Sequence, residues 1–83
     1  MEQELYYVYI LRSLSNPKRY YMGRSEQPST RLAEHNSGKS PHTKEYRPWQ
    51  IKNLIAFSNK EKALTFERYL KTRSGRAFAK KRL

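Results

Sequence analysis

Carboxylates are scarce in this chain, and one of them stands apart from the rest. All seven acidic residues are glutamates, with Glu2 and Glu4 in what we expect to be a frayed terminus. Glu67 falls four residues after Ala63 and three before Leu70, on or beside an apolar helical face. A carboxylate there is costly unless a cation or a metal ion meets it. An i,i+4 pair with a lysine at position 71 explains the residue equally well, so both interpretations stay open.

Two tyrosines, an arginine and a histidine form a second group of candidates. Tyr9 and Tyr21 belong to two apolar runs expected to pair as a hairpin, so their hydroxyls can converge. Arg31 and His35 are four residues apart and share one face of the helix expected there. Each also has a plain explanation, because buried tyrosines are commonly core residues and an Arg–His pair suits a solvated face. Taken singly, none of them assigns a function.

The charge of the chain indicates a polyanionic partner. Its formal net charge is +11, and such a charge favours nucleic acid or an anionic surface. Residues 39–83 carry thirteen basic and three acidic residues, and the long polar loop 37–48 supplies Lys39, Lys44 and Arg47 as candidate substrate contacts. The interleaved aromatic residues predicted to stack on bases are Tyr46, Trp49, Tyr69 and Phe78. A solvated, solubilising tail is the alternative.

Several classes of protein are excluded by composition. The chain has no cysteine, which rules out a disulfide scaffold, a thiolate metal site and a cysteine nucleophile. It has no aspartate, so a two-metal site built on clustered aspartates is not expected. The longest apolar run, residues 5–11, is far short of the ~20 residues of a membrane span. We therefore expect a cytoplasmic protein with no membrane partner.

The elements that must position these residues form one small α+β domain over residues 1–83. We expect a three-stranded, mostly antiparallel sheet flanked by helices, in the order β-β-α-β-α-α. The expected strands are residues 5–11, 19–23 and 49–57, and the expected helices are residues 28–36, 58–71 and 76–83. The first strand is aromatic and β-branched throughout, which predicts burial on both faces and a central place in the sheet.

Turn and cap residues set the expected helix boundaries. Gly38 is expected as a left-handed cap after the first helix. Ser58 is expected to cap the second helix, with Glu61 completing a capping box. The Ser74-Gly75 pair is expected to break the helical pattern before the last short helix.

The order of these residues resembles a known family, the GIY-YIG nuclease domain. The matching residues are Tyr7-Val8-Tyr9, Tyr21-Met22-Gly23, Arg31, His35 and Glu67. The family is named for two tripeptides on its first two strands. It includes the nuclease half of the bacterial excinuclease C subunit, certain homing endonucleases and small stand-alone single-domain proteins, and the chain resembles the last kind along nearly its whole length.

The resemblance implies roles for several of these residues and for Arg24. Catalytic roles fall to Tyr9 in activating water, Tyr21 in orienting water or phosphate, Arg31 in contacting the phosphate and His35 one helical turn further on. Gly23 would allow close approach to the substrate, and Arg24 falls where some members have a basic group. Glu67 would bind a single divalent ion, Mg²⁺ or Mn²⁺. The implied activity is metal-dependent hydrolysis of phosphodiester bonds.

Some positions depart from the family pattern. The first tripeptide lacks its glycine, Met22 replaces isoleucine, and the asparagine that several members carry after the glutamate is missing. A non-catalytic nucleic-acid-binding module on the same fold is therefore the second interpretation, and a basic structural accessory is the third. We expect nucleic acid, DNA first, as the partner. We also expect a protein partner for targeting, because larger members carry separate targeting domains.

Overall fold

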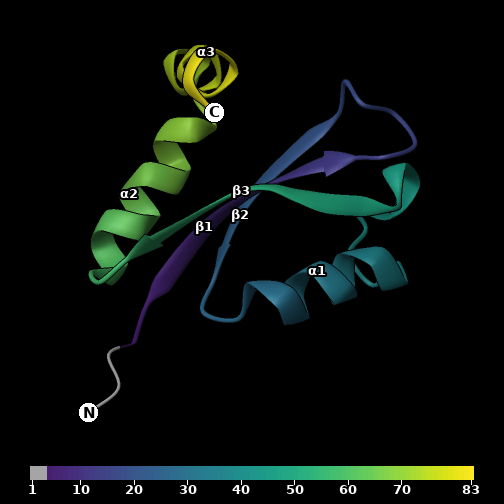
Figure 1. Cartoon of the computed structure of the whole chain (residues 1–83), viewed down its shortest axis with the longest axis horizontal. Coiled ribbons are helices and arrows are strands. Elements are labelled where there is room, and N and C mark those ends of the chain that lie inside the picture. Colours follow the sequence, from purple (N-terminus) through teal and green to yellow (C-terminus); the bar gives the residue numbers. More distant parts are fainter. Residues whose placement is uncertain (1–3) are drawn as a thin grey trace.

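A computed structural model describes residues 4–83, so the expectation for Glu2 lies outside the described residues. Its elements follow in chain order (Figure 1): β1 (Tyr6–Ser13), β2 (Tyr20–Ser25), α1 (Pro28–Ser37), the 3₁₀ helix η1 (Lys44–Tyr46), β3 (Trp49–Phe57), α2 (Lys60–Leu70) and α3 (Arg73–Arg82). This is the expected β-β-α-β-α-α order, with a short 3₁₀ turn added inside the long loop. None of the helices described in residues 4–83 has the length and apolar character needed to cross a bilayer.

The sheet is antiparallel and has the order β2-β1-β3, so the first strand is central as predicted. Residues 8–11 are all buried, because neighbouring strands cover both edges and helices cover both faces. Tyr9 lies opposite Gly23 on β2 and opposite Leu54 on β3. An irregularity in the β1–β3 register follows Ile10. The predicted fold class is confirmed.

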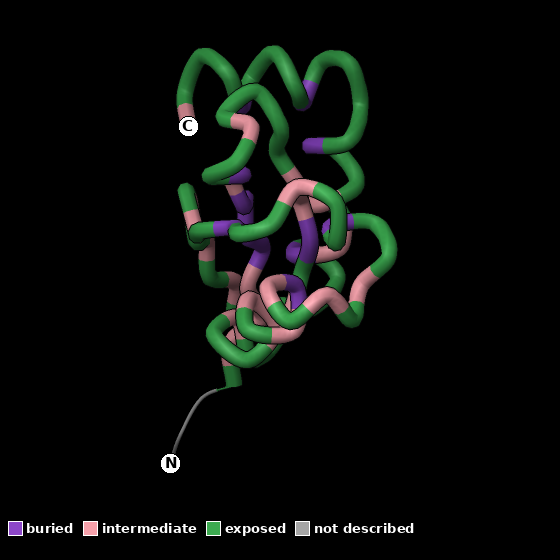
Figure 2. Tube along the Cα trace, turned by 90° about the vertical axis from the view of Figure 1, so that its right-hand side faces the viewer, coloured by how far each residue is buried: buried purple, intermediate pink, exposed green. Residues whose placement is uncertain are grey.

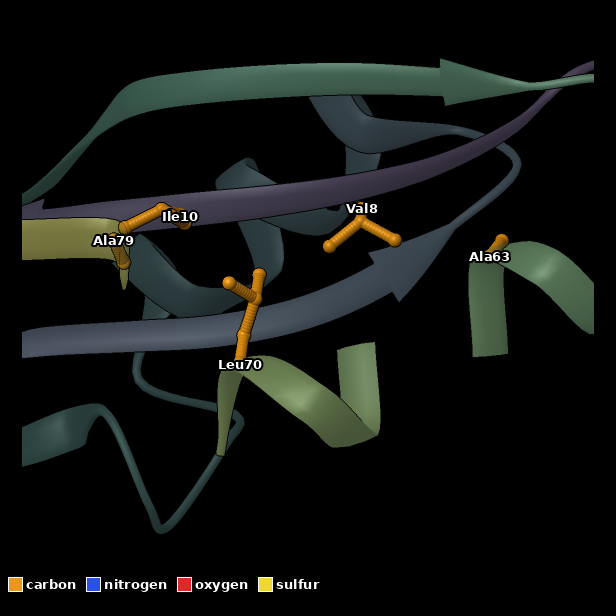
Figure 3. Close-up of a cluster of buried hydrophobic side chains, with 5 residues drawn as sticks. All are labelled: Val8, Ile10, Ala63, Leu70 and Ala79. Atoms are coloured by element: carbon orange, nitrogen blue, oxygen red, sulfur yellow. The ribbon is translucent and has the colours of Figure 1, made fainter. Parts of the chain in front are cut away.

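Two small cores lie on the two faces of the sheet. Side chains from β1 meet α2 and α3 on one face, and Figure 3 draws this cluster: Val8, Ile10, Ala63, Leu70 and Ala79. On the other face Tyr9, Leu11 and Trp49 pack with Leu32 of α1. Buried stretches follow the middle of the trace, whereas the outer turns of the helices are mostly exposed (Figure 2). The α1 face is the one that carries the candidate site.

The N-terminal cap of α2 differs from the prediction. Asn59, rather than Ser58, is the cap, and its side-chain oxygen accepts a hydrogen bond from the backbone N–H of Lys62 at 3.0 Å. Serine and asparagine are both good caps, so the sequence pattern did not separate them. Because the helix begins one residue later, Glu61 falls one position short of the place that a capping box requires.

The predicted break at Ser74-Gly75 is also wrong, because both residues lie in the first turn of α3. The helices separate earlier, where the Thr72 side chain caps α3 by accepting from the Gly75 N–H at 3.0 Å. A Cβ on Gly75 would lie 1.7 Å from the Tyr69 carbonyl oxygen. Glycine is therefore needed here for the close contact between α2 and α3. The predicted left-handed cap at Gly38 is confirmed, with φ of 86°.

Candidate active site

The Tyr9 side chain lies across β2, the edge strand next to β1. Its partner on β2 is Gly23, and a Cβ on this glycine would lie 2.5 Å from the Tyr9 hydroxyl oxygen and 2.6 Å from Cζ. The phenol ring therefore occupies the space that any other residue would fill at position 23. The resemblance implied a glycine for approach of the substrate, but the contact seen in the structure is with Tyr9 itself.

We expect Gly23→Ala to displace the Tyr9 ring and to lower the free energy of unfolding by ~1–3 kcal/mol, the usual cost of overpacking. Denaturant unfolding of the variant measures this loss. The same substitution in a Tyr9→Ala background should cost much less, because the ring that collides with the new Cβ is gone. An equal cost in both backgrounds would contradict this explanation of the glycine.

His35 of α1 is fully buried and joins two parts of the site. Its Nε2 lies 3.0 Å from the Tyr9 hydroxyl oxygen, and its Nδ1 lies 2.7 Å from the hydroxyl oxygen of Thr43. The Tyr21 ring packs against the imidazole with a centroid distance of 4.9 Å. The explanation of His35 as part of a solvated helix face is therefore wrong. Tyr9 and Tyr21 both contact this imidazole, and the convergence of their hydroxyls stays a prediction.

The surroundings keep both hydrogen-bonded partners neutral. Burial raises the pKa of the Tyr9 phenol, nearby Tyr21 adds to this, and the Arg31 guanidinium opposes it. Burial lowers the pKa of His35, and the positive charge of Arg31 lowers it further. Near pH 7 the pair is therefore a protonated phenol beside a neutral imidazole.

Arg31 stands in the first half of α1 with its guanidinium held from one side. Its Nη1 lies 2.6 Å from Oε2 of Glu34, and this carboxylate is the main cause that raises the pKa of Arg31. About 40% of the Arg31 side chain stays exposed. The guanidinium thus lies near the Tyr9 hydroxyl and is also open to a ligand from solvent.

Glu67 of α2 faces the same edge strand from the other side of the sheet. Its side chain is only 13% exposed, with Oε1 3.5 Å from Arg24 Nε and Oε2 3.4 Å from Lys71 Nζ. The expected pair with Lys71 is present, and Arg24 is an added partner. Arg24, proposed from the resemblance as a substrate contact, contacts this carboxylate and is 41% exposed, so a contact with substrate stays a prediction. The negative charge of Glu67 also makes a small contribution to the raised pKa of Tyr9.

The donor set at Glu67 fits one hard cation. Within residues 4–83 no three side chains of His, Cys, Asp or Glu gather as a metal-binding cluster. A lone carboxylate leaves most coordination positions to water and phosphate, an arrangement typical of Mg²⁺. The two ion pairs are long, and the Arg24 and Lys71 side chains are 41% and 51% exposed, so they can yield to a bound ion.

Three of the candidate substrate contacts lie elsewhere. Lys39, Lys44 and Arg47 are exposed and follow the C-terminal end of α1. The Arg47 guanidinium lies over Gly38, and Nε of Arg47 donates to the carbonyl of Lys44 at 2.9 Å. The structure does not bring them to the Tyr9 hydroxyl. They therefore stay predictions for contacts with a longer ligand.

The predicted stacking aromatics fall into two groups. Trp49, the first residue of β3, is buried and its Nε1 donates to the carbonyl of Thr43 at 2.8 Å, so its prediction as a base-stacking residue is wrong. Tyr46 packs beside the same core under the Arg19 guanidinium. Tyr69 and Phe78 are exposed, on α2 and α3.

The contact of the Thr43 hydroxyl with His35 was not predicted from the sequence, because no periodicity marks this loop residue.

The comparisons with protein families and with curated proteins agree on one family. The GIY-YIG catalytic domain family matches residues 5–82. The structure-specific endonuclease subunit SLX1 of Debaryomyces hansenii is 39% identical over 74 residues, which are 81% of this chain and 21% of that protein. The structure-specific endonuclease subunit SLX1 of Candida dubliniensis is 39% identical over 72 residues, which are 78% of this chain and 25% of that protein. The SLX1 homolog of Giardia intestinalis is 35% identical over 65 residues, which are 74% of this chain and 18% of that protein. The chain thus spans a quarter or less of the length of these relatives.

Proposed function

The chain belongs to the GIY-YIG nuclease family, and from this premise we propose that it is a catalytic domain that hydrolyses phosphodiester bonds in structured DNA. The observation that carries the proposal is the hydrogen bond between the Tyr9 hydroxyl and Nε2 of His35. Arg31 lies beside this pair, and Glu67 lies near the same edge strand. The family match and the endonuclease relatives favour this function over the non-catalytic binding module.

The Tyr9–His35 pair can accept a proton from the attacking water. The raised pKa of Tyr9 excludes a free phenolate near pH 7, so the phenol acts as a relay. The water oxygen bonds to phosphorus and its proton passes to the Tyr9 oxygen, while the Tyr9 hydroxyl hydrogen passes to Nε2 of His35. The bond from phosphorus to the leaving oxygen then breaks, the leaving oxygen takes a proton from solvent water, and His35 returns its extra proton to solvent. The neutral imidazole kept by burial is the required starting state.

The remaining groups relieve charge and hold the phosphate. The fork of the Arg31 guanidinium suits two phosphate oxygens, and its ion pair with Glu34 restricts its orientation. GIY-YIG nucleases are generally metal-dependent, and we propose that Glu67 holds one Mg²⁺ or Mn²⁺. Such an ion supplies electrostatic stabilisation of the phosphate oxygens. Tyr21 packs on His35 and orients the substrate from the same strand as Gly23.

Substrate and partner follow from the relatives and from charge. The relatives are named structure-specific endonuclease subunits, so we propose branched or flapped DNA as the substrate and a second protein chain as the partner that directs cleavage. The net charge of +11 supports binding to a polyanion. Localisation in the cytoplasm stays a prediction from the sequence.

A cleavage assay tests the proposal directly. The full chain is incubated with Mg²⁺ or Mn²⁺ and end-labelled DNA in four forms: nicked, flapped, single-stranded and fully paired duplex. We expect metal-dependent cleavage of the flapped or nicked forms in preference to the duplex of the same sequence. Binding without cleavage of any form, with either metal, would contradict the proposed nuclease and support the binding module.

The stability of the protein should depend on pH through His35. Its folded-state pKa lies below the unfolded value of 6.5, so below that pH the unfolded chain binds a proton that the folded chain does not. We therefore expect the free energy of unfolding to fall as the pH drops through 6.5 and to level off below the folded-state pKa. Denaturant unfolding between pH 8 and 4 measures the fall, and NMR follows the two histidines separately. A titration of His35 above 6.5 would contradict the prediction.

A further inference from the structure

Thr43 is a buried polar residue whose contacts converge on the candidate site. Its side chain is fully buried, and its hydroxyl oxygen lies 2.7 Å from Nδ1 of His35. The same hydroxyl can donate to the carbonyl of Ser40 at 3.5 Å, while the Thr43 carbonyl accepts from the indole N–H of Trp49 at 2.8 Å. The hydroxyl is thus held in place against the imidazole, on the side away from Tyr9.

The hydrogen bonds around Thr43 select one tautomer of His35. A neutral imidazole carries hydrogen on one nitrogen only, and the other nitrogen accepts. The Thr43 hydroxyl has a single hydrogen, which it donates to the carbonyl of Ser40, so toward Nδ1 of His35 it acts as an acceptor. The imidazole hydrogen is therefore on Nδ1. Nε2 is then the accepting nitrogen, and the Tyr9 hydroxyl, 3.0 Å away, donates to it.

We propose that Thr43 is a positioning residue: by accepting the Nδ1–H of His35, its hydroxyl holds the imidazole in the tautomer whose Nε2 receives the Tyr9 hydroxyl hydrogen. In the other tautomer an N–H would face the phenol and the relay could not start. The catalytic consequence rests on the proposed function, whereas the tautomer assignment does not. Thr43 acts through His35, since its hydroxyl contacts the imidazole nitrogen that faces away from Tyr9.

The tautomer is measured on the full chain at pH 7 from the ¹⁵N chemical shifts of the two ring nitrogens of His35. We expect the parent to carry hydrogen on Nδ1. Thr43→Ser keeps the hydroxyl and should give the same shifts. Thr43→Val keeps the shape without the hydroxyl and should move the shifts towards the Nε2–H form. Hydrogen on Nε2 in the parent, or unchanged shifts in a folded Thr43→Val, overturns the proposal without any cleavage assay.

Cleavage kinetics give the second readout. Thr43→Val should lower kcat by about 10-fold or more with KM nearly unchanged, the scale of loss when a group that orients a site residue is removed. Thr43→Ser should restore most of the rate. A shifted tautomer with parental kcat overturns the positioning role. If the parent cleaves no DNA at all, the nuclease proposal fails, and the ring-nitrogen shifts alone still decide whether Thr43 sets the tautomer of His35.

Discussion

We expect the replacement of Glu67 with glutamine to lower metal-dependent cleavage by at least about 100-fold and to leave the protein folded. Glutamine keeps the shape of a side chain that is 13% exposed, but it removes the charge that would hold the ion. Electrostatic stabilisation by a bound metal is worth several kcal/mol, and ~2.7 kcal/mol corresponds to 100-fold in rate. Single-turnover cleavage with Mg²⁺ and with Mn²⁺ measures the loss.

The stability of Glu67→Gln should change little, because the side chains of the two cationic partners are 41% and 51% exposed, and ion pairs in contact with water are worth only ~0–1 kcal/mol. Glu61→Gln is the matched control, since this glutamate is exposed on the same helix. It should keep parental cleavage. A melting temperature many degrees lower in Glu67→Gln, together with no effect of Mg²⁺ on the parent, would make the residue structural and the proposed metal site wrong.

Much of the fold was predictable because local composition and tertiary packing agree. The apolar run at residues 5–11 predicted a central strand, and β1 is buried on both faces. The errors arose where two local signals compete. Ser58 and Asn59 are equally good caps, and Gly75 resembles a helix breaker until its contact with the Tyr69 carbonyl is known. The place of Gly75 could not be predicted without this tertiary contact.

The candidate site was predicted in part. Its residues on strands and helices could be placed from the sequence, whereas its loop residue could not. Tyr9, Tyr21, Arg31 and His35 are on regular elements, so strand pairing and helix periodicity placed them near one another. The partner of His35 comes from an irregular loop, and no sequence period fixes where a loop residue such as Thr43 lies. For the same reason the places of the basic loop residues Lys39, Lys44 and Arg47 could not be predicted: they follow the C-terminal end of α1 and stay predicted substrate contacts.

Tyr9→Phe and Arg31→Ala should each lower the cleavage rate by about 100-fold or more, the lower range of general acid–base contributions, and the double variant should lose little further. Such non-additivity is expected because one hydroxyl group, hydrogen-bonded to His35 and adjacent to the guanidinium, would serve a single transition state. Tyr9→Phe should cost only ~1 kcal/mol of stability, since it removes one hydrogen bond.

The matched control for this pair is Tyr7→Phe, because Tyr7 is two residues from Tyr9 on the same face of β1 and no described hydrogen bond of its hydroxyl joins it to the site. It should cleave at the parental rate. Near-parental cleavage by a folded Tyr9→Phe would remove the phenol from the proton path. If instead the losses of Tyr9→Phe and Arg31→Ala multiply in the double variant, the two groups act independently. The contacts around His35 would then describe packing rather than a shared catalytic unit.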